Sequence, residues 1–180
     1  MSSKRGPWRV IDVKNVYKNS WIEVKEDKVI RPDGNKGIFG VVKVKSGVSV
    51  LPIDDNKNIY LIEQFRYVLG KKNIEAVSGG IENKEKPLDA AKRELKEETG
   101  IEAKEWVDLG KINPLTIIDS TNYLFIAKNL TFLNASPEGT ENIKLLKIPL
   151  EKAINWVMEG LITNSLTALL ILKIKELKNS

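Results

Sequence analysis

A cluster of glutamates near the middle of the chain constrains its fold more than any other feature. The run RELKEETG closes a segment that we expect to be a helix over Pro87–Thr99, with proline in its first turn and Gly100 just past its last. Glu94, Glu97 and Glu98 then lie three and four residues apart or adjacent, where like charges repel and destabilise a helix. The fold must therefore offset this repulsion.

The expected helix has three distinct faces when its residues are placed about 100° apart. The apolar positions form one narrow stripe that we expect to face the core: Leu88, Ala91 and Leu95. The opposite positions are charged and should face solvent: Asp89, Lys92 and Lys96. The glutamates fill a third sector beside the apolar stripe, which is unusual for a solvated run of charge. The alternative is an exposed amphipathic helix whose glutamates pair with lysine and arginine.

Two glycines upstream of this helix suggest what the glutamates bind. In Ser78-Gly79-Gly80, the glycines allow backbone carbonyls to turn towards the acidic sector. Carboxylates and carbonyls together form an all-oxygen site that suits Mg²⁺ or Mn²⁺, and such a cation would offset the repulsion. The chain has no histidine and no cysteine, so acid–base or metal chemistry must use carboxylates, Lys, Tyr, hydroxyls or water.

Composition narrows the class of protein. The 180 residues suit one domain with a small appendage, and the net charge of +5 is spread through mixed Lys/Glu patterns. Such a charge favours an anionic small molecule more than nucleic acid. No apolar run approaches the roughly 20 residues that span a bilayer, and MSSKRGPWRV lacks the apolar stretch of a signal peptide. We therefore expect a cytoplasmic protein that binds neither nucleic acid nor membrane.

Turn residues divide the chain near Ser46–Gly47. We expect a small antiparallel β-domain over residues 1–46, with three strands: Trp8–Val13, Trp21–Ile30 and Ile38–Lys45. Residues 47–180 mix strands with helices, without regular βαβ alternation, so we expect an α/β (α+β) fold or a layered α/β/α arrangement. Its expected strands are 48–53, 58–65, 122–130 and 143–150, and its further helices are Leu150–Glu159 and Ser165–Leu177.

The central segment resembles the Nudix box, Gly-x₅-Glu-x₇-Arg-Glu-apolar-x-Glu-Glu-x-Gly-apolar. Every fixed position is filled: Gly79, Glu85, Arg93, Glu94, Leu95, Glu97, Glu98, Gly100 and Ile101. The resemblance implies a Nudix fold, with a mixed sheet between helices, and hydrolysis of a nucleoside diphosphate linked to another moiety. It implies that Glu94, Glu97, Glu98 and the Ser78 carbonyl bind Mg²⁺. It further implies that Arg93 holds the glutamates by salt bridges, supported by Glu85.

The resemblance extends to the ADP-ribose and nucleoside-diphosphate-sugar pyrophosphatases. WRVIDVKNVYKNSWIEVKEDKVIRPDG looks like their small N-terminal β-domain, LIEQFRY like their QYR strand, and IEAVSGGIE like their WE-x-PAGxIE lead-in. This implies a homodimer in which that domain completes the partner's active site. It also implies substrate contacts from Gln64, Arg66 and Glu75, although Gln64 and Arg66 equally suit an outward strand face. For the N-terminal aromatics we prefer packing or dimer contact over base stacking: Trp8, Tyr17, Trp21 and Phe39.

Departures from the subgroup pattern keep the substrate open. Val77 replaces the usual proline and Ile74 the usual tryptophan, and NPLTIIDSTN lacks the glycine and glutamate that commonly follow the box in ADP-ribose hydrolases. Asp119 and Ser120 either line a sugar site or shape a loop. We expect Mg²⁺-dependent hydrolysis of ADP-ribose or another nucleotide sugar. The alternatives are a hydrolase of triphosphates, dinucleotide cofactors or RNA ends, and a module that senses a nucleotide without cleaving it.

The general base is expected on a loop after the box. In the subgroup a glutamate on a mobile loop often serves, and the matching segment NASPEGTENIK offers Glu138 and Glu141. We prefer Glu141, because ENIKLLKIPLEKA resembles the E-x-I entry into the next strand. The alternatives are that both are solvated loop acids, or that the base lies in the box, where Glu97 is the first choice.

Overall fold

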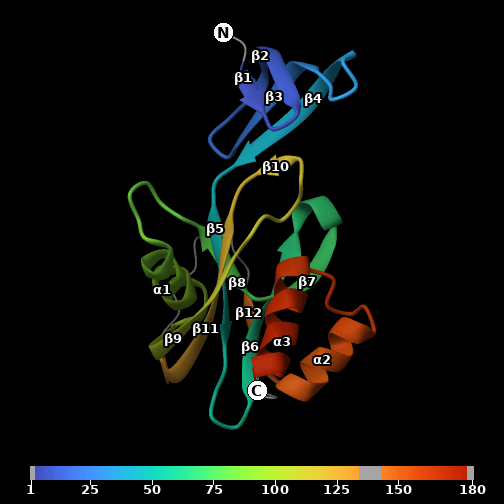
Figure 1. Ribbon diagram of the computed structural model, residues 1–180. Coiled ribbons are helices and arrows are strands. Elements are labelled where there is room, and N and C mark those ends of the chain that lie inside the picture. The colour runs from blue at the N-terminus through green and yellow to red at the C-terminus, as the bar shows by residue number, and fades with distance from the viewer. Residues whose placement is uncertain (1–2, 134–142, 178–180) are drawn as a thin grey trace. The chain divides into compact units, whose positions relative to one another are not determined.

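The computed structural model describes residues 3–133 and 143–177, with side chains up to residue 174 (Figure 1). The chain separates into two compact units. The first comprises the residues up to 46 together with 113–121, and the second comprises 47–112 and the residues from 122 onwards. The segment 113–121, which we assigned from the sequence to the second domain, thus packs with the N-terminal residues.

The first unit is one five-stranded sheet in the order β1-β2-β3-β4-β10. Its strands are β1 (Ser3–Arg5), β2 (Trp8–Lys18), β3 (Ile22–Ile30), β4 (Lys36–Val44) and β10 (Ile118–Asp119). The first four are antiparallel to their neighbours, and β10 lies parallel to β4. This pairing explains why 113–121 belongs here. The three expected strands are present, and β2 runs five residues past its predicted end.

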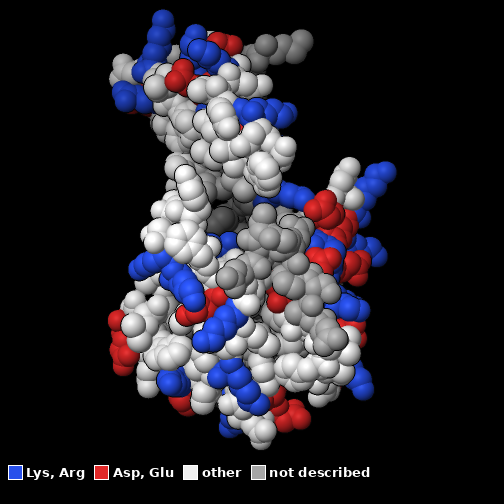
Figure 2. Space-filling view, turned by 180° about the vertical axis from the view of Figure 1, so that it is seen from behind, with Lys and Arg blue, Asp and Glu red and all other residues white. Residues whose placement is uncertain are grey.

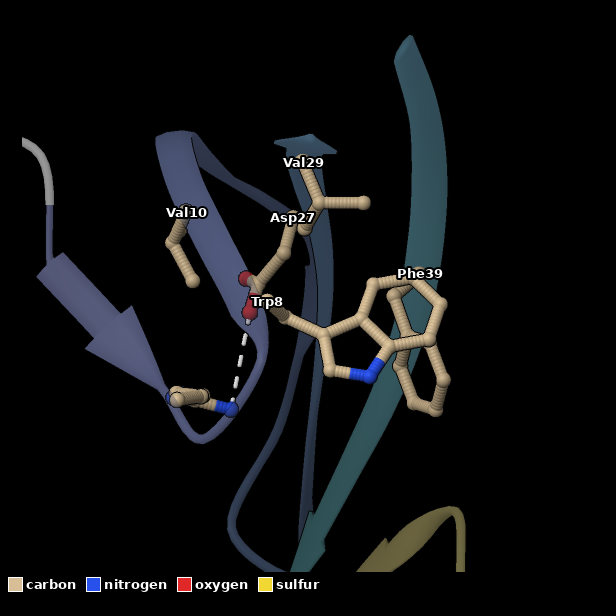
Figure 3. Close-up of a pocket in the computed structure, with 6 residues that line it drawn as sticks. Trp8, Val10, Asp27, Val29 and Phe39 are labelled. Atoms are coloured by element: carbon tan, nitrogen blue, oxygen red, sulfur yellow. Dashed lines mark ion pairs between the residues drawn. The ribbon is translucent and has the colours of Figure 1, made fainter. Parts of the chain in front are cut away.

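One face of this sheet carries a small hollow of about 130 Å³ (Figure 3). Trp8 and Phe39 meet edge to face there, with ring centroids 5.8 Å apart. Asp27 lies buried beside them and forms an ion pair with Arg5 at 3.5 Å. Trp8 and Phe39 therefore pack within the sheet, as preferred from the sequence, whereas Trp21 is 76% exposed.

The second unit contains two sheets and three α-helices. One sheet has the order β8-β5-β11-β9 and the other β12-β6-β7. The strands are β5 (Gly47–Pro52), β6 (Asn58–Arg66), β7 (Lys71–Glu75), β8 (Val77–Gly80), β9 (Ile101–Ile112), β11 (Asn122–Phe132) and β12 (Lys144–Pro149). The helices are α1 (Pro87–Thr99), α2 (Leu150–Met158) and α3 (Ser165–Leu177), with a 3₁₀ turn over Tyr67–Leu69. Since β5 and β11 run parallel and β9 and β11 antiparallel, the first sheet is mixed.

Helices cover both faces of these sheets, with α1 on one side and α2 and α3 on the other (Figure 1). Strand β5 shows how the sequence produces this layering. Val48 and Val50 pack in one core with Leu95 of α1, while Leu51 joins a second core with Leu170 of α3. Alternate residues of a strand point to opposite faces, so a nearly continuous apolar run buries both. The predicted α+β sandwich is confirmed.

Some elements differ from the sequence prediction. Ser78–Gly80 was expected in a loop, but these residues form most of strand β8 and pair with β5. No strand was predicted for residues 71–75 or 101–112, which form β7 and β9. Glycine has low strand propensity, so the sequence of β8 does not indicate a strand, and the 101–112 segment is half polar, so the sequence of β9 does not either. These two strands form because they pair with distant parts of the chain.

On the face shown in Figure 2, basic and acidic side chains are interspersed over the described surface and form no single basic area. Among the described residues, no helix is long and apolar enough to cross a membrane.

Candidate active site

Helix α1 brings the glutamates to the edge of the core. Its first residue is Pro87, and Gly100 ends it with a left-handed φ of 68° while its N–H bonds the Lys96 carbonyl. Leu95 is fully buried and Lys96 is exposed, as predicted. Glu98 is also buried, with 6% of its surface exposed, which is rare for a glutamate. The acidic sector therefore borders the core and is not a solvated face.

Arg93 is the centre of the site's charge network. Its Nε donates to Glu85 Oε1 at 2.9 Å and its Nη2 to Glu85 Oε2 at 3.1 Å. Its Nη1 donates to Glu94 Oε1 at 2.7 Å and to Glu97 Oε2 at 3.1 Å. Its Nη2 also donates to the Gly80 carbonyl at 2.9 Å. These hydrogen bonds raise the pKa of Arg93, and the bond with Glu85 has the largest effect. The guanidinium thus holds two of the three clustered glutamates and links α1 to β8.

Gly79 lets strand β8 approach this helix closely. A Cβ at Gly79 would lie 1.9 Å from the carboxyl carbon of Glu94 and 2.0 and 2.3 Å from its oxygens. A Cβ at Gly47, in the adjacent strand, would lie 2.8 Å from the Gly79 carbonyl oxygen. Only glycines therefore allow the Glu94 carboxylate, the β8 backbone and β5 to pack together at this point.

The donors here suit a hard divalent cation. The Glu94 carboxylate lies against the backbone of Gly79 in the space that a Cβ would fill, and Glu98 is buried on the same helix. Among the described side chains, no three acidic groups already converge as a cation cage, because Glu94 and Glu97 turn towards Arg93. The residues that would hold the ion are oxygen donors throughout, as Mg²⁺ and Mn²⁺ prefer. Their metal-binding role remains a prediction.

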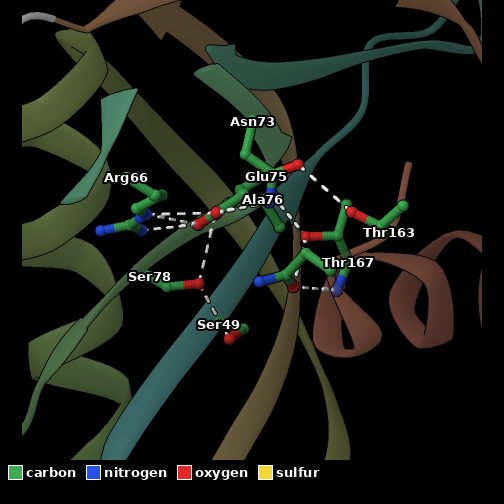
Figure 4. A network of polar contacts seen from close by, with 9 residues as sticks. Ser49, Arg66, Asn73, Glu75, Ala76, Ser78, Thr163 and Thr167 are labelled. Carbon is green, nitrogen blue, oxygen red and sulfur yellow. Dashed lines mark hydrogen bonds and ion pairs between the residues drawn. The ribbon is translucent and has the colours of Figure 1, made fainter. Parts of the chain in front are cut away.

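A second polar cluster lies where the chain passes from β7 to β8 (Figure 4). Arg66 forms a bidentate ion pair with Glu75, whose closest contact is Nη2 to Oε2 at 2.5 Å. Asn73 Nδ2 also donates to Glu75 Oε1 at 2.9 Å. Glu75 is 4% exposed, whereas the Arg66 side chain is 41% exposed. The cluster therefore pairs a buried carboxylate with a guanidinium that reaches the surface.

Residues at the start of helix α3 and just before it complete this cluster. Thr167 Oγ1 accepts a hydrogen bond from the Ala76 N–H at 2.8 Å, and it donates to Asn164 Oδ1 at 2.9 Å. Thr163 Oγ1 donates to Asn73 Oδ1 at 3.4 Å. The sequence analysis missed these residues. Asn164 lies three residues before Thr167, a spacing typical of a helix N-cap. This pattern indicates where the helix starts, but it does not indicate that Thr167 bonds Ala76 across the fold.

A hollow of about 630 Å³ adjoins the cluster, and it is lined by Arg66–Leu69, Asn73, Glu75 and residues 163–165. The other predicted site residues lie elsewhere or are not described. Gln64 is buried on β6, at 6% exposure. Asp119 and Ser120 belong to the first unit, where Ser120 Oγ donates to the Lys45 carbonyl at 3.2 Å. Glu138 and Glu141 lie outside the described residues.

An arginine-tethered glutamate helix on a mixed sheet between helices defines a class of phosphoanhydride hydrolase, and the family comparison agrees. The model of the Nudix domain matches residues 43–156, and that of the nucleoside diphosphate sugar hydrolase N-terminal domain matches residues 8–42. The chain belongs to the Nudix family and is a Nudix hydrolase. Members of this family generally use a divalent metal ion.

Individual relatives match over most of the chain. It is 28% identical to a methanol dehydrogenase activator of Bacillus methanolicus, over 91% of this chain and 90% of that protein. It is 29% identical to an ADP-ribose pyrophosphatase of Bacillus subtilis (strain 168), over 93% of this chain and 94% of that protein. The fold is also similar to the crystal structure of an ADP compounds hydrolase, with a TM-score of 0.83 and 17% sequence identity. The match covers 97% of this chain and 96% of that chain.

Proposed function

We propose that this enzyme hydrolyses the pyrophosphate bond of ADP-ribose or another nucleoside diphosphate sugar, with Mg²⁺ or Mn²⁺ as cofactor. The products are a nucleoside monophosphate and a sugar phosphate. One observation carries the proposal, namely that Arg93 binds Glu85, Glu94 and Glu97 together, with Glu94 seated against Gly79. A protein that only sensed a nucleotide would not need all of these carboxylates.

The chain's residues divide the chemistry among them. The cation would be held by Glu94, Glu97, Glu98 and the Ser78 carbonyl. Before the cation binds, Arg93 orients the carboxylates of the helix. When bound, the ion neutralises charge on the pyrophosphate and lowers the pKa of the attacking water. The water oxygen bonds to phosphorus as the bridging P–O bond breaks, and its proton passes to a carboxylate.

We assign that proton to Glu141, with Glu138 and then Glu97 as the alternatives. Glu75 holds the Arg66 guanidinium by an ion pair, and we propose that this guanidinium contacts a phosphate of the substrate. Bidentate contact of this kind is typical of arginine with phosphate. We also propose Gln64 and Glu75 as substrate contacts, as the family resemblance implies. For Asp119 and Ser120 we propose contact with the sugar, and the alternative is that they only shape their loop.

The substrate assignment draws on the relatives. The N-terminal match is to a domain of nucleoside diphosphate sugar hydrolases, and proteins named ADP-ribose pyrophosphatase match at 29% and 26% identity. The sequence NPLTIIDSTN departs from the ADP-ribose pattern, and this keeps GDP-mannose and other nucleotide sugars within the proposal. A substrate panel separates these possibilities.

We propose a cytoplasmic homodimer formed largely through the N-terminal β-domain, residues 1–46. The described part of this domain exposes large apolar side chains: Ile11, Val13, Val16, Tyr17, Trp21 and Ile38. Apolar groups gathered on one small sheet are typical of an interface. Light scattering at micromolar concentrations should give twice the chain mass, and a monomer throughout would contradict the dimer.

The test of function is a panel of ADP-ribose, GDP-mannose, UDP-glucose, NADH and deoxynucleoside triphosphates, each with Mg²⁺ and with EDTA. Products separated by ion-exchange chromatography should be a monophosphate and a sugar phosphate from at least one nucleotide sugar. Preferred cleavage of NADH or a triphosphate would move the enzyme to those substrate classes. Binding without cleavage of any of them would favour a sensing module.

A further inference from the structure

The chain changes sheets between two parts of the site. Strand β7 belongs to the sheet β12-β6-β7 and ends at Glu75, whereas β8 belongs to the sheet β8-β5-β11-β9 and begins at Val77. Ala76 alone separates them. On one side of it lies Glu75, bound to Arg66, and on the other lie Ser78 and Gly79, which adjoin the box helix. The backbone conformation of Ala76 thus affects how the Arg66–Glu75 ion pair and the backbone of Ser78 and Gly79 are placed relative to each other.

A crossing of this kind leaves backbone groups without ladder partners. Ala76 is fully buried and belongs to neither strand, so its N–H has no water to bond. A buried N–H needs a partner, and Thr167 Oγ1 of helix α3 provides it at 2.8 Å. The bond joins residues 91 positions apart. Helix α3 also lies beyond residue 156, where the match to the Nudix domain ends.

The orientation of the threonine hydroxyl is itself fixed. A hydroxyl has one proton, and that of Thr167 is donated to Asn164 Oδ1 at 2.9 Å. Asn164 Oδ1 also accepts the Thr167 N–H at 3.0 Å, so the asparagine is held by the first turn of its own helix. A lone pair of the hydroxyl is therefore left for the Ala76 N–H. Thr167 is 1% exposed, so no water replaces either contact.

We infer that Thr167 is a positioning residue for the hydrolase reaction, and that Asn164 orients its hydroxyl. Thr167 fixes the β7–β8 crossing and thereby the spacing between Glu75 and the Ser78–Gly79 backbone. It acts through Ala76 and touches no substrate. This inference rests on the proposed function for its kinetic consequence, but its effect on the backbone and on metal binding stands apart from any substrate.

The test compares Thr167→Val, which keeps the shape and loses the hydroxyl, with Thr167→Ser, which keeps the hydroxyl. Ile171→Val is the control, because Ile171 is a fully buried residue of the same helix that shares the core with Ala76 but has no side-chain hydrogen-bonding group. Three quantities are measured well below the unfolding temperature: kcat at saturating ADP-ribose and Mg²⁺, the Mn²⁺ dissociation constant by electron paramagnetic resonance, and amide exchange of Ala76 by NMR.

We expect Thr167→Val to lower kcat about tenfold or more, since small misplacement of catalytic groups is costly. It should also weaken Mn²⁺ binding and speed exchange at Ala76, and Thr167→Ser should restore all three. Ile171→Val should lower the unfolding temperature alone. If Thr167→Val lowers the unfolding temperature but leaves kcat and Mn²⁺ affinity at the wild-type values, the inference is overturned. If the wild type cleaves no substrate, the proposed function fails, while weaker Mn²⁺ binding and faster exchange in Thr167→Val still support the positioning role.

Discussion

Replacing Gly79 by alanine probes the contact between strand β8 and the acidic helix. The new Cβ would lie 1.9 Å from the carboxyl carbon of Glu94, and its three nearest atoms all belong to that carboxyl group. Ordinary contact between carbons needs about 3.5 Å, so the carboxylate must retreat by about 1.5 Å. Glutamate is flexible, and the backbone therefore has no need to move. The change displaces one predicted metal ligand and little else.

The expected loss of activity is large, and the expected loss of stability is small. Misplacing a reacting group by about 1 Å costs on the order of 10² in rate, so kcat with ADP-ribose should fall by about that factor. Arg93 would lose its bond to Glu94 but keep those to Glu85, Glu97 and the Gly80 carbonyl. The free energy of unfolding should thus fall by no more than about 1.5–3 kcal/mol, the range for one hydrogen bond between charged groups.

The assay is steady-state hydrolysis across a Mg²⁺ series, together with unfolding in urea. Gly40→Ala is the matched control, because Gly40 lies in strand β4 and its Cβ would meet nothing within 4 Å. The Gly79→Ala enzyme should need more Mg²⁺ for half its maximal rate, and Gly40→Ala should not. If the two variants keep the same kcat and Mg²⁺ dependence within about threefold, the close packing at Gly79 does not serve catalysis.

Three further outcomes are expected. Glu98→Gln should abolish most turnover while the urea transition stays in place, because losing one carboxylate also relieves repulsion; normal turnover at limiting Mg²⁺ would contradict its role. Glu141→Gln should lower kcat about 10²- to 10⁴-fold with metal affinity nearly unchanged, and the same loss in Glu138→Gln alone would transfer the role of base. Burial raises the pKa of Asp54, but hydrogen bonds, led by that from Lys147, lower it overall. Its stabilisation is therefore complete above about pH 4 and lost as pH falls further, so Asp54→Asn should flatten that acid limb in urea unfolding.

The sequence predicted those parts of the fold that depend on local patterns. Helix α1 carries its start, its end and its apolar stripe within thirteen residues, and the structure has it at the predicted bounds. A strand over 48–53 was likewise expected, and the structure has β5 at Gly47–Pro52. Strand β8 could not be predicted, because Ser78-Gly79-Gly80 has low strand propensity and is held by its pairing with β5.

The site was predictable where the residues are close in sequence. The box placed Arg93 beside the glutamates it contacts, since all lie on one helix and the preceding loop. The bond from Ala76 to Thr167 spans 91 positions, and no local pattern specifies it. The same holds for residues 113–121, whose place in the first unit depends on the pairing of β10 with β4. Long-range contacts of this kind depend on the whole fold.

Arg93 gives the acidic helix its own counter-ion. Its guanidinium already touches Glu94 and Glu97, so part of the negative charge is balanced within the folded chain. A divalent ion that bound at these predicted ligands would therefore have to replace contacts of an arginine. Its affinity is the difference between two sets of contacts, and we expect it to be moderate. Such an enzyme would follow the free concentration of the ion around it, taking it up and releasing it within the working life of each molecule.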